Sequence, residues 1–324
     1  MSHPHPLDIL FLTNFSDYCF RAIPAIAQMA DAFKVRLTIM HVYDPNRTSK
    51  AAAEDRTRSF FPEADRYSAC SRVTVAGPIL AAVKRHLETW PINLIVAPSS
   101  DVIGLPQLGQ SSLRAALVRE CGVPLWTLGR RVNMEALPKP VRNVACWLDF
   151  NEDQTNHVYF AAQYARALGA KLHLLRALPH ISEGALVHPD DTEKALHPRL
   201  AIQELKQLCD AAEISPELHL GVGEGSRNLN RMLRAAEADV VFFGREESWL
   251  ADWLGLGLRR ADAAPCPAVY ISDQMNVPLW NLERGSGLHV VAIRTGRERV
   301  DALTPVAARN GNAPGGVLAQ LGLA

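Results

Sequence analysis

Glycine-rich turns are the first residues in this sequence that could do chemistry, because backbone N–H groups at such turns can hold a phosphate. Gly221-Val-Gly-Glu-Gly-Ser226 is one of them, but its glycines do not have the G-x-G-x-x-G spacing. We interpret this segment as a tight turn, since Gly223 aligns with Gly77 in the internal repeat described below. The sequence contains no G-x-S-x-G, no G-x4-G-K-[ST] and no H-E-x-x-H motif, so these motifs give enzymatic chemistry no support.

Histidine and cysteine side chains offer metal-binding or general-base chemistry, yet none has a partner at a suitable spacing. His3 and His5 alternate with prolines; a flexible terminus is the simpler interpretation, and a metal-binding tip is the alternative. His41 and His173 fall in predicted strands with no carboxylate and hydroxyl spaced for catalysis, so we interpret both as solvated or hydrogen-bonded. Cys146 should be a buried apolar residue of a strand. The sequence therefore predicts no catalytic residue and no metal ligand.

The composition is typical of a globular protein in a reducing compartment. The 324 residues are 48% hydrophobic and 21% charged, and 34 Lys and Arg balance 34 Asp and Glu. A chain without net charge has no field to attract nucleic acid or an anionic membrane, so we expect neither partner. The six cysteines show no C-x-x-C spacing, and the start lacks the pattern of a signal peptide. Because no apolar run reaches about 18 residues, we expect a cytoplasmic protein.

Short apolar runs alternate with amphipathic ones, which is typical of α/β units. The pattern predicts a strand over residues 8–13, a helix with Ser16 as its N-cap, and a second strand over 35–42. The same order returns later, with strands over 144–148 and 171–177 on either side of a helix. The chain therefore contains an internal repeat.

The two copies align at an offset of 135 at first, then 146, and finally 143, where Val123-Pro-Leu-Trp126 falls on Cys266-Pro-Ala-Val269. A repeat of this length is too long for a solenoid, so each copy should be a whole domain. The predicted organisation is a first domain at 1–130, a linker at 131–141, a second domain at 142–273 and a C-terminal extension at 274–324.

Right-handed crossovers would wind each copy into a mostly parallel, five-stranded, doubly wound (Rossmann-like) sheet with helices on both faces. Each copy ends in a short apolar strand, 124–128 or 267–271, and bare edges of this kind invite aggregation. We predict that these two strands pair antiparallel, which makes an intramolecular pseudo-dimer; a further homodimer stays open. The extension holds one predicted strand over 288–293 and a Gly/Pro/Ala-rich end expected to be mobile.

The motifs and their order in both copies resemble the universal stress protein family, in its tandem two-domain form. They are Thr13-Asn-Phe-Ser-Asp17, Gly77-Pro78, and Ala238-Asp-Val-Val-Phe-Phe-Gly244 leading to Ala264-Pro-Cys-Pro-Ala-Val269. The resemblance covers roughly residues 7–128 and 142–272. It implies a small α/β protein of nucleotide-binding type. In ATP-binding members it implies an Asp after the first strand, an apolar residue ending the second, and G-x2-G-x9-G-[ST] after the fourth.

The first copy has lost this ATP-binding pattern. Asn14 stands at the Asp position, and Pro98, Asp101 and Ser111-Ser112 stand in the fourth-strand motif. Pro98 has no N–H to donate, and Asp101 would face a phosphate. We expect no ATP in this copy.

The second copy keeps more of the pattern. The resemblance implies the following nucleotide-binding residues: Asp149, Phe150, Ala177, Gly244, Arg245 and Gly257. However, Glu247 replaces the middle glycine, Glu246 precedes it, and Leu258 replaces the Ser or Thr. Two carboxylates would repel a triphosphate unless a nearby arginine or Mg²⁺ compensates. Either this copy binds an adenine nucleotide weakly, or its glycines are turn residues only.

Three functions follow from this resemblance. The leading one is a non-enzymatic stress-response protein that binds ATP or another adenine nucleotide weakly, if at all, in its second domain. The second is a regulatory switch, in which bound ATP or AMP changes the affinity for an unknown protein partner. The third is a slow nucleotide hydrolase, for which the sequence offers no general base.

Overall fold

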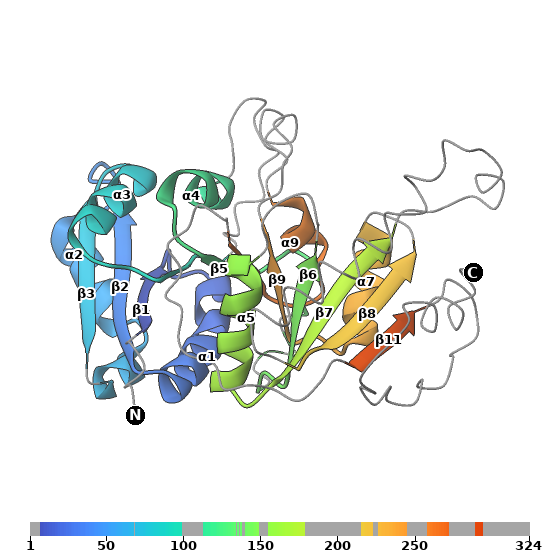
Figure 1. The fold of residues 1–324 in the computed structure, drawn as a ribbon. Helices are drawn as coiled ribbons and strands as arrows, with labels where there is room; N and C mark the ends of the chain where they lie inside the picture. The colour runs from blue at the N-terminus through green and yellow to red at the C-terminus, as the bar shows by residue number, and fades with distance from the viewer. Residues whose placement is uncertain are drawn as a thin grey trace.

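The computed structural model describes residues 7–67, 69–98, 113–133, 135, 137, 140–148, 155–178, 215–222, 226–244, 258–271 and 289–293 (Figure 1). Its strands are β1 Leu7–Leu12, β2 Val35–Tyr43, β3 Cys70–Ala76, β4 Leu94–Val96, β5 Leu125–Thr127, β6 Asn143–Leu148, β7 Lys171–Leu178, β8 Glu217–Val222, β9 Val240–Phe243, β10 Ala268–Tyr270 and β11 His289–Ile293. Its helices are α1 Asp17–Ala32, α2 Lys50–Ser59, α3 Ile79–Thr89, α4 Leu113–Cys121, α5 Thr155–Ala167, α7 Ser226–Ala235 and α9 Arg259–Ala263, with a 3₁₀ turn η1 at Pro62–Arg66.

All eleven described strands form one sheet, in the order β11-β8-β7-β6-β9-β10-β5-β4-β1-β2-β3. We call β1 to β5 the first half and β6 to β11 the second half. Within each half the first strand lies between the second and the fourth, which is the doubly wound order. The described pairings within each half are parallel. The predicted α/β fold class is therefore confirmed, as a single continuous sheet.

The burial of the strand residues explains why the strands could be predicted from the sequence. Every residue of β1 is buried, as parallel strands covered on both faces require. Asp8 is the polar exception in this strand, and its carboxylate forms an ion pair with Arg36 of β2. The strands predicted over 8–13, 35–42, 144–148 and 171–177 all lie within one residue of their expected bounds.

The two halves join through β5 and β10, the last strand of each copy of the repeat. β5 and β10 pair antiparallel, with Trp126 opposite Val269 and Tyr270 opposite Leu125. This pairing was predicted from two apolar edges that would otherwise be bare, and it is confirmed. α1 and α5 lie side by side over the middle of the sheet (Figure 1), where the ring centroids of Phe33 and Tyr164 are 6.1 Å apart.

The C-terminal extension contributes to the sheet. The strand predicted over 288–293 is present as β11, which pairs parallel with the outer edge of β8. The second half therefore has one strand more than the five expected from the repeat. The rest of the extension lies outside the described residues.

The start of α1 lies where the sequence predicts it. Ser16 occupies the N-cap position as expected, although its side chain makes no cap hydrogen bond to the helix backbone. Its hydroxyl instead donates to Cys19 Sγ at 3.7 Å, while Asn14 Oδ1 accepts a hydrogen bond from the Ser16 N–H at 3.0 Å. The predicted N-cap residue is therefore confirmed, with a local partner for its hydroxyl in place of the helix backbone.

Arg114 of α4 links the two halves outside the sheet. Its guanidinium donates to Asp262 Oδ1 of α9 at 2.9 Å and to the Leu128 carbonyl at 3.2 Å. The two charged side chains are only 11% and 21% exposed, so water screens this ion pair less than a surface pair.

We expect Arg114→Met to lower the free energy of unfolding by about 2 kcal/mol, because it leaves Asp262 half-buried without its main cation. The control is Arg119→Met, whose ion pair with Glu120 is more exposed and should be worth about 0.5 kcal/mol or less. Urea denaturation of both variants measures the difference. Equal losses of unfolding free energy in the two variants would show that the Arg114–Asp262 ion pair stabilises the protein no more than an exposed ion pair does.

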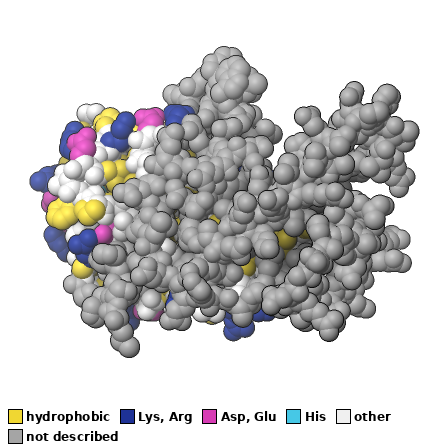
Figure 2. All heavy atoms as spheres, in the orientation of Figure 1, with side chains coloured by type: hydrophobic (Ala, Val, Ile, Leu, Met, Phe, Trp, Pro, Cys, Tyr) yellow, Lys and Arg dark blue, Asp and Glu magenta, His cyan; other side chains and the backbone are white. Residues whose placement is uncertain are grey.

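The visible described surface carries both signs of charge. Figure 2 shows Lys and Arg side chains beside Asp and Glu side chains over the first half. Ion pairs such as Lys84–Glu120 and Arg58–Asp55 join side chains of opposite charge in the first half. Among the described helices, none is both long and apolar enough to cross a membrane.

Candidate functional site

The strand order identifies where a ligand of a doubly wound sheet would bind. In such sheets the site lies beyond the carboxyl ends of the strands, where the chain order reverses. These switch points fall between β1 and β4 in the first half and between β6 and β9 in the second. The residues that follow β1 and β6 are Asn14 and Asp149, after one and no intervening residues respectively. The sequence motifs and the topology therefore point to the same edge of the sheet.

Two of the six predicted nucleotide-binding residues are described. Ala177 lies in β7 opposite Gly221 of β8, and Gly244 follows β9 directly. The other four lie outside the described residues: Asp149, Phe150, Arg245 and Gly257. Glu246 and Glu247, the two predicted obstacles to a triphosphate, lie outside them as well.

A guanidinium that the sequence analysis did not single out lies at this edge in the second half. Arg176 is paired with Leu148 in the register of β7 and β6, and its Nη1 donates to the Leu148 carbonyl at 3.1 Å. The contact holds a positive charge beside the carboxyl end of β6. Its only sequence signal was its position next to Ala177.

Gly244 lies above a buried histidine. A Cβ atom at position 244 would be 3.7 Å from the ring of His157 in α5, which is an ordinary contact distance. His157 is 1% exposed, and its Nε2 lies 3.2 Å from the Trp147 carbonyl. Among the described residues, therefore, none lies close enough to require glycine at position 244.

At the corresponding edge of the first half, the polar side chains after β1 form hydrogen bonds with nearby residues of the same segment. Asn14 Oδ1 accepts hydrogen bonds from the Ser16 N–H at 3.0 Å and from Cys19 Sγ at 3.2 Å. Thr13 Oγ1 accepts from the N–H of Phe15, whose backbone is left-handed with φ 63°. The side-chain oxygen of Asn14 therefore stabilises the local turn between β1 and α1.

Aromatic side chains occupy the space beside this loop. The Phe15 ring lies 4.4 Å from the His41 ring and 5.5 Å from the Phe60 ring, and the Arg56 guanidinium lies 4.5 Å above it. His41 Nδ1 is 2.9 Å from the Thr13 carbonyl, and burial lowers the pKa of His41. His41 is thus hydrogen-bonded, as the sequence analysis expected.

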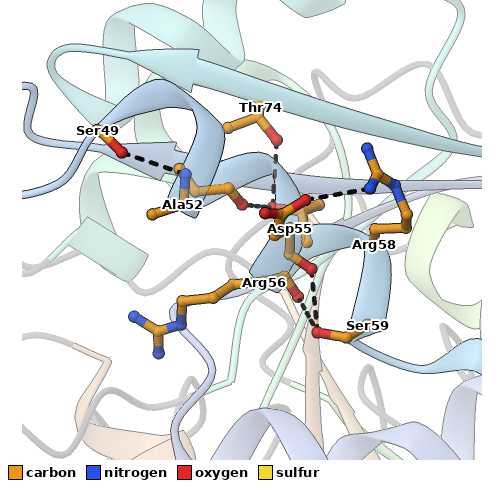
Figure 3. A network of polar contacts seen from close by, with 9 residues as sticks. Ser49, Ala52, Asp55, Arg56, Arg58, Ser59 and Thr74 are labelled. Atoms are coloured by element: carbon orange, nitrogen blue, oxygen red, sulfur yellow. Dashed lines mark hydrogen bonds and ion pairs between the residues drawn. The ribbon is translucent and has the colours of Figure 1, made fainter.

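Arg56 is positioned by a helix with well-defined side-chain contacts. Ser49 caps α2 by accepting from the Ala52 N–H at 3.3 Å, and Arg58 pairs with Asp55 at 3.1 Å (Figure 3). Thr74 of β3 donates to Thr57 of α2 at 3.2 Å. These contacts hold α2 against the sheet, with Arg56 directed away from them in Figure 3.

A cavity of about 120 Å³ lies elsewhere, between the two halves. Gln28 of α1, Trp126 of β5 and Tyr164 of α5 contribute to its lining, together with Asp239 and Cys266 near the amino ends of β9 and β10. It is therefore separate from the edge where the sequence places the nucleotide.

The sheet order and the glycine at its second switch point define a Rossmann-like α/β protein. Residues 140–257, which begin just before the second half, match the model of the universal stress protein family. The resemblance found in the sequence is thereby confirmed for this part of the chain. No curated protein matches the sequence.

Solved structures extend the likeness in fold to most of the chain. A functionally unknown protein from Pseudomonas aeruginosa PAO1 has a TM-score of 0.57 at 14% identity, over 82% of this chain and 92% of its own. A universal stress protein from Archaeoglobus fulgidus DSM 4304 has a TM-score of 0.56 at 14% identity, over 82% of this chain and 96% of its own. A putative universal stress protein from Pseudomonas aeruginosa UCBPP-PA14 has a TM-score of 0.55 at 14% identity, over 82% of this chain and 92% of its own. At this identity the comparisons establish the fold.

Proposed function

We propose that this protein is a non-enzymatic stress-response protein of universal stress type, whose second domain binds an adenine nucleotide weakly. The observation that carries the proposal is the asymmetry between the two switch points. In the first half, Asn14 is used within its own loop and Phe15 packs against His41. In the second half, Arg176 and Gly244 lie at the corresponding edge.

The domain boundaries belong to the same proposal. We place the first domain at 1–130, the linker at 131–141, the second domain at 142–273 and the extension at 274–324. The repeated strand order and the family match at residues 140–257 support this division.

The proposed nucleotide site combines described and undescribed residues. Gly244 would let the backbone approach a phosphate closely, and the Arg176 guanidinium would offset part of its charge. Asp149 would accept hydrogen bonds from the adenine or ribose side. Glu247 would limit the affinity, since an unpaired carboxylate beside a phosphate costs on the order of 1–4 kcal/mol at short range.

Titration calorimetry with ATP and AMP tests the proposal. We expect weak binding to the wild type, tighter binding by Glu247→Gly, and none by Asp149→Ala. Gly244→Ala should also weaken binding without unfolding the chain, because its Cβ would meet only ordinary contacts. Asn14→Ala, at the equivalent position of the first half, is the matched control and should bind as the wild type does.

Three outcomes would contradict this proposal. Stoichiometric ATP released on denaturing the purified protein would show that the site is strong. Loss of binding in Asn14→Ala alone would place the nucleotide in the first half. Steady release of phosphate from ATP, abolished by Asp149→Ala, would favour the hydrolase.

A further inference from the structure

Three potential metal ligands meet in the second half, on one face of the sheet. His173 is the third residue of β7, and Glu217 and His219 are the first and third residues of β8. The parallel register pairs His173 with Glu217, and His219 follows on the same face two residues later. The group therefore lies near the amino ends of these strands, at the edge opposite to the proposed nucleotide site.

Their ligand atoms converge on one point. His173 Nδ1 is 2.9 Å from His219 Nε2 and 3.4 Å from Glu217 Oε2, and His219 Nε2 is 3.9 Å from the same oxygen. Ligands of a tetrahedral zinc ion, with bonds of about 2.0–2.2 Å, are separated from one another by about 3.3 Å. A divalent metal would therefore need only small side-chain adjustments to bind here.

A neighbouring amide sets the protonation of His173. Asn143 Nδ2 donates to the Glu237 carbonyl at 3.3 Å, which directs Asn143 Oδ1 toward His173 Nε2 at 3.2 Å. Because an amide oxygen only accepts, His173 carries its proton on Nε2 and presents the Nδ1 lone pair to the group. Metal-binding histidines are commonly oriented by a second hydrogen bond of this kind.

The group is buried. His173 and His219 are 4% and 3% exposed. Glu217 Oε1 faces Lys171 Nζ at 3.8 Å, whereas Glu217 Oε2 lies 3.4 Å from His173 Nδ1. Oε2 is therefore the carboxylate oxygen that faces the two imidazoles.

The first half shows that the fold does not need these side chains. At the equivalent register position Thr38 of β2 pairs with Ser71 of β3, and their hydroxyl oxygens are 3.0 Å apart. The second half thus places an imidazole and a carboxylate where two hydroxyl groups serve the same sheet. Buried polar groups without a structural requirement are candidates for a binding role.

We propose that His173, Glu217 and His219 form a binding site for a first-row divalent transition metal such as Zn²⁺, independent of the nucleotide site. Two neutral imidazoles and one carboxylate form a ligand set that zinc uses in proteins. Asn143 is the positioning residue, since it acts through His173. The bound metal would crosslink β7 and β8.

Zinc binding to the full-length chain tests the proposal, after treatment with a chelator and in the presence of a non-thiol reductant. We expect one Zn²⁺ per chain, and Co²⁺ in its place should give the intense visible absorption of a four-coordinate complex. At a zinc concentration about a hundred times the Kd, the melting temperature should rise by roughly 5–10 °C. No saturable binding, or an octahedral Co²⁺ spectrum, would overturn the proposal.

Variants locate the metal. His173→Leu replaces a buried imidazole of β7 with an apolar side chain, and it should lose zinc binding, as should His219→Gln and Glu217→Gln. Asn143→Ala should weaken zinc binding by about 10–100-fold. His86→Gln, which changes a histidine on α3, is the matched control and should bind as the wild type does. Binding that survives His173→Leu and is lost in a His3→Ala/His5→Ala variant would place the metal at the N-terminus and overturn the proposal.

Discussion

Trp126→Ala should lower the free energy of unfolding by about 3–5 kcal/mol, as expected for removing a fully buried tryptophan. Trp126 is 1% exposed and lies at the centre of the joint between the two halves. It pairs with Val96 of β4 on one side and with Val269 of β10 on the other. The cavity left by its loss would therefore weaken both the core of the first half and the pairing between the halves.

Trp90→Ala is the matched control for this substitution. Trp90 ends α3 and is 58% exposed, so its replacement should change the stability by about 0.5 kcal/mol or less. Guanidinium denaturation followed by circular dichroism measures both variants. Similar midpoints for the two would show that the β5–β10 joint is not part of the stable core.

Gly129→Ala should destabilise the protein by about 3 kcal/mol or more, because the backbones of the two halves touch at this glycine. A Cβ atom at position 129 would lie 1.8 Å from the carbonyl oxygen of Ala261 and 2.7 Å from its carbonyl carbon. Both are backbone atoms of α9, so the clash cannot be relieved by rotating a side chain. The end of β5 and α9 would have to separate, which would also strain the Arg114–Asp262 ion pair.

Gly244→Ala is the matched control, because the nearest atom to its Cβ would be 3.7 Å away. It should unfold at nearly the wild-type denaturant concentration. Each variant adds one methyl group to the wild type. The difference between their denaturation midpoints therefore measures the effect of the close backbone approach at Gly129. An unchanged midpoint for Gly129→Ala would contradict the tight joint between the halves.

The sequence alone determined most of the fold. Strands covered on both faces consist mainly of consecutive apolar residues, and β1 and β6 are recognisable for that reason. The repeat located β5 and β10, and the need to cover bare edges predicted their antiparallel pairing. These inferences depend on local pattern and on one general property of sheets, which is why no tertiary information was needed.

The candidate nucleotide site could be predicted only in part from the sequence. Asp149, Ala177 and Gly244 were found because the family pattern carries them in order along the chain. Arg176 was not singled out, since its place at this edge depends on a hydrogen bond to the Leu148 carbonyl of a neighbouring strand. A single sequence gives no signal for such a contact between strands.

Only the tertiary structure decided which polar residues meet. In the sequence, His173 and Glu217 are far apart; His173 was interpreted as an ordinary strand histidine, and Glu217 was not singled out. Parallel pairing of β7 with β8 brings them into register, and His219 joins them because side chains two residues apart share a face. Likewise, Phe15 meets Arg56 only through the packing of α2 on the sheet. Periodicity along the chain specifies the face on which a side chain lies, whereas strand register and helix packing specify its neighbours.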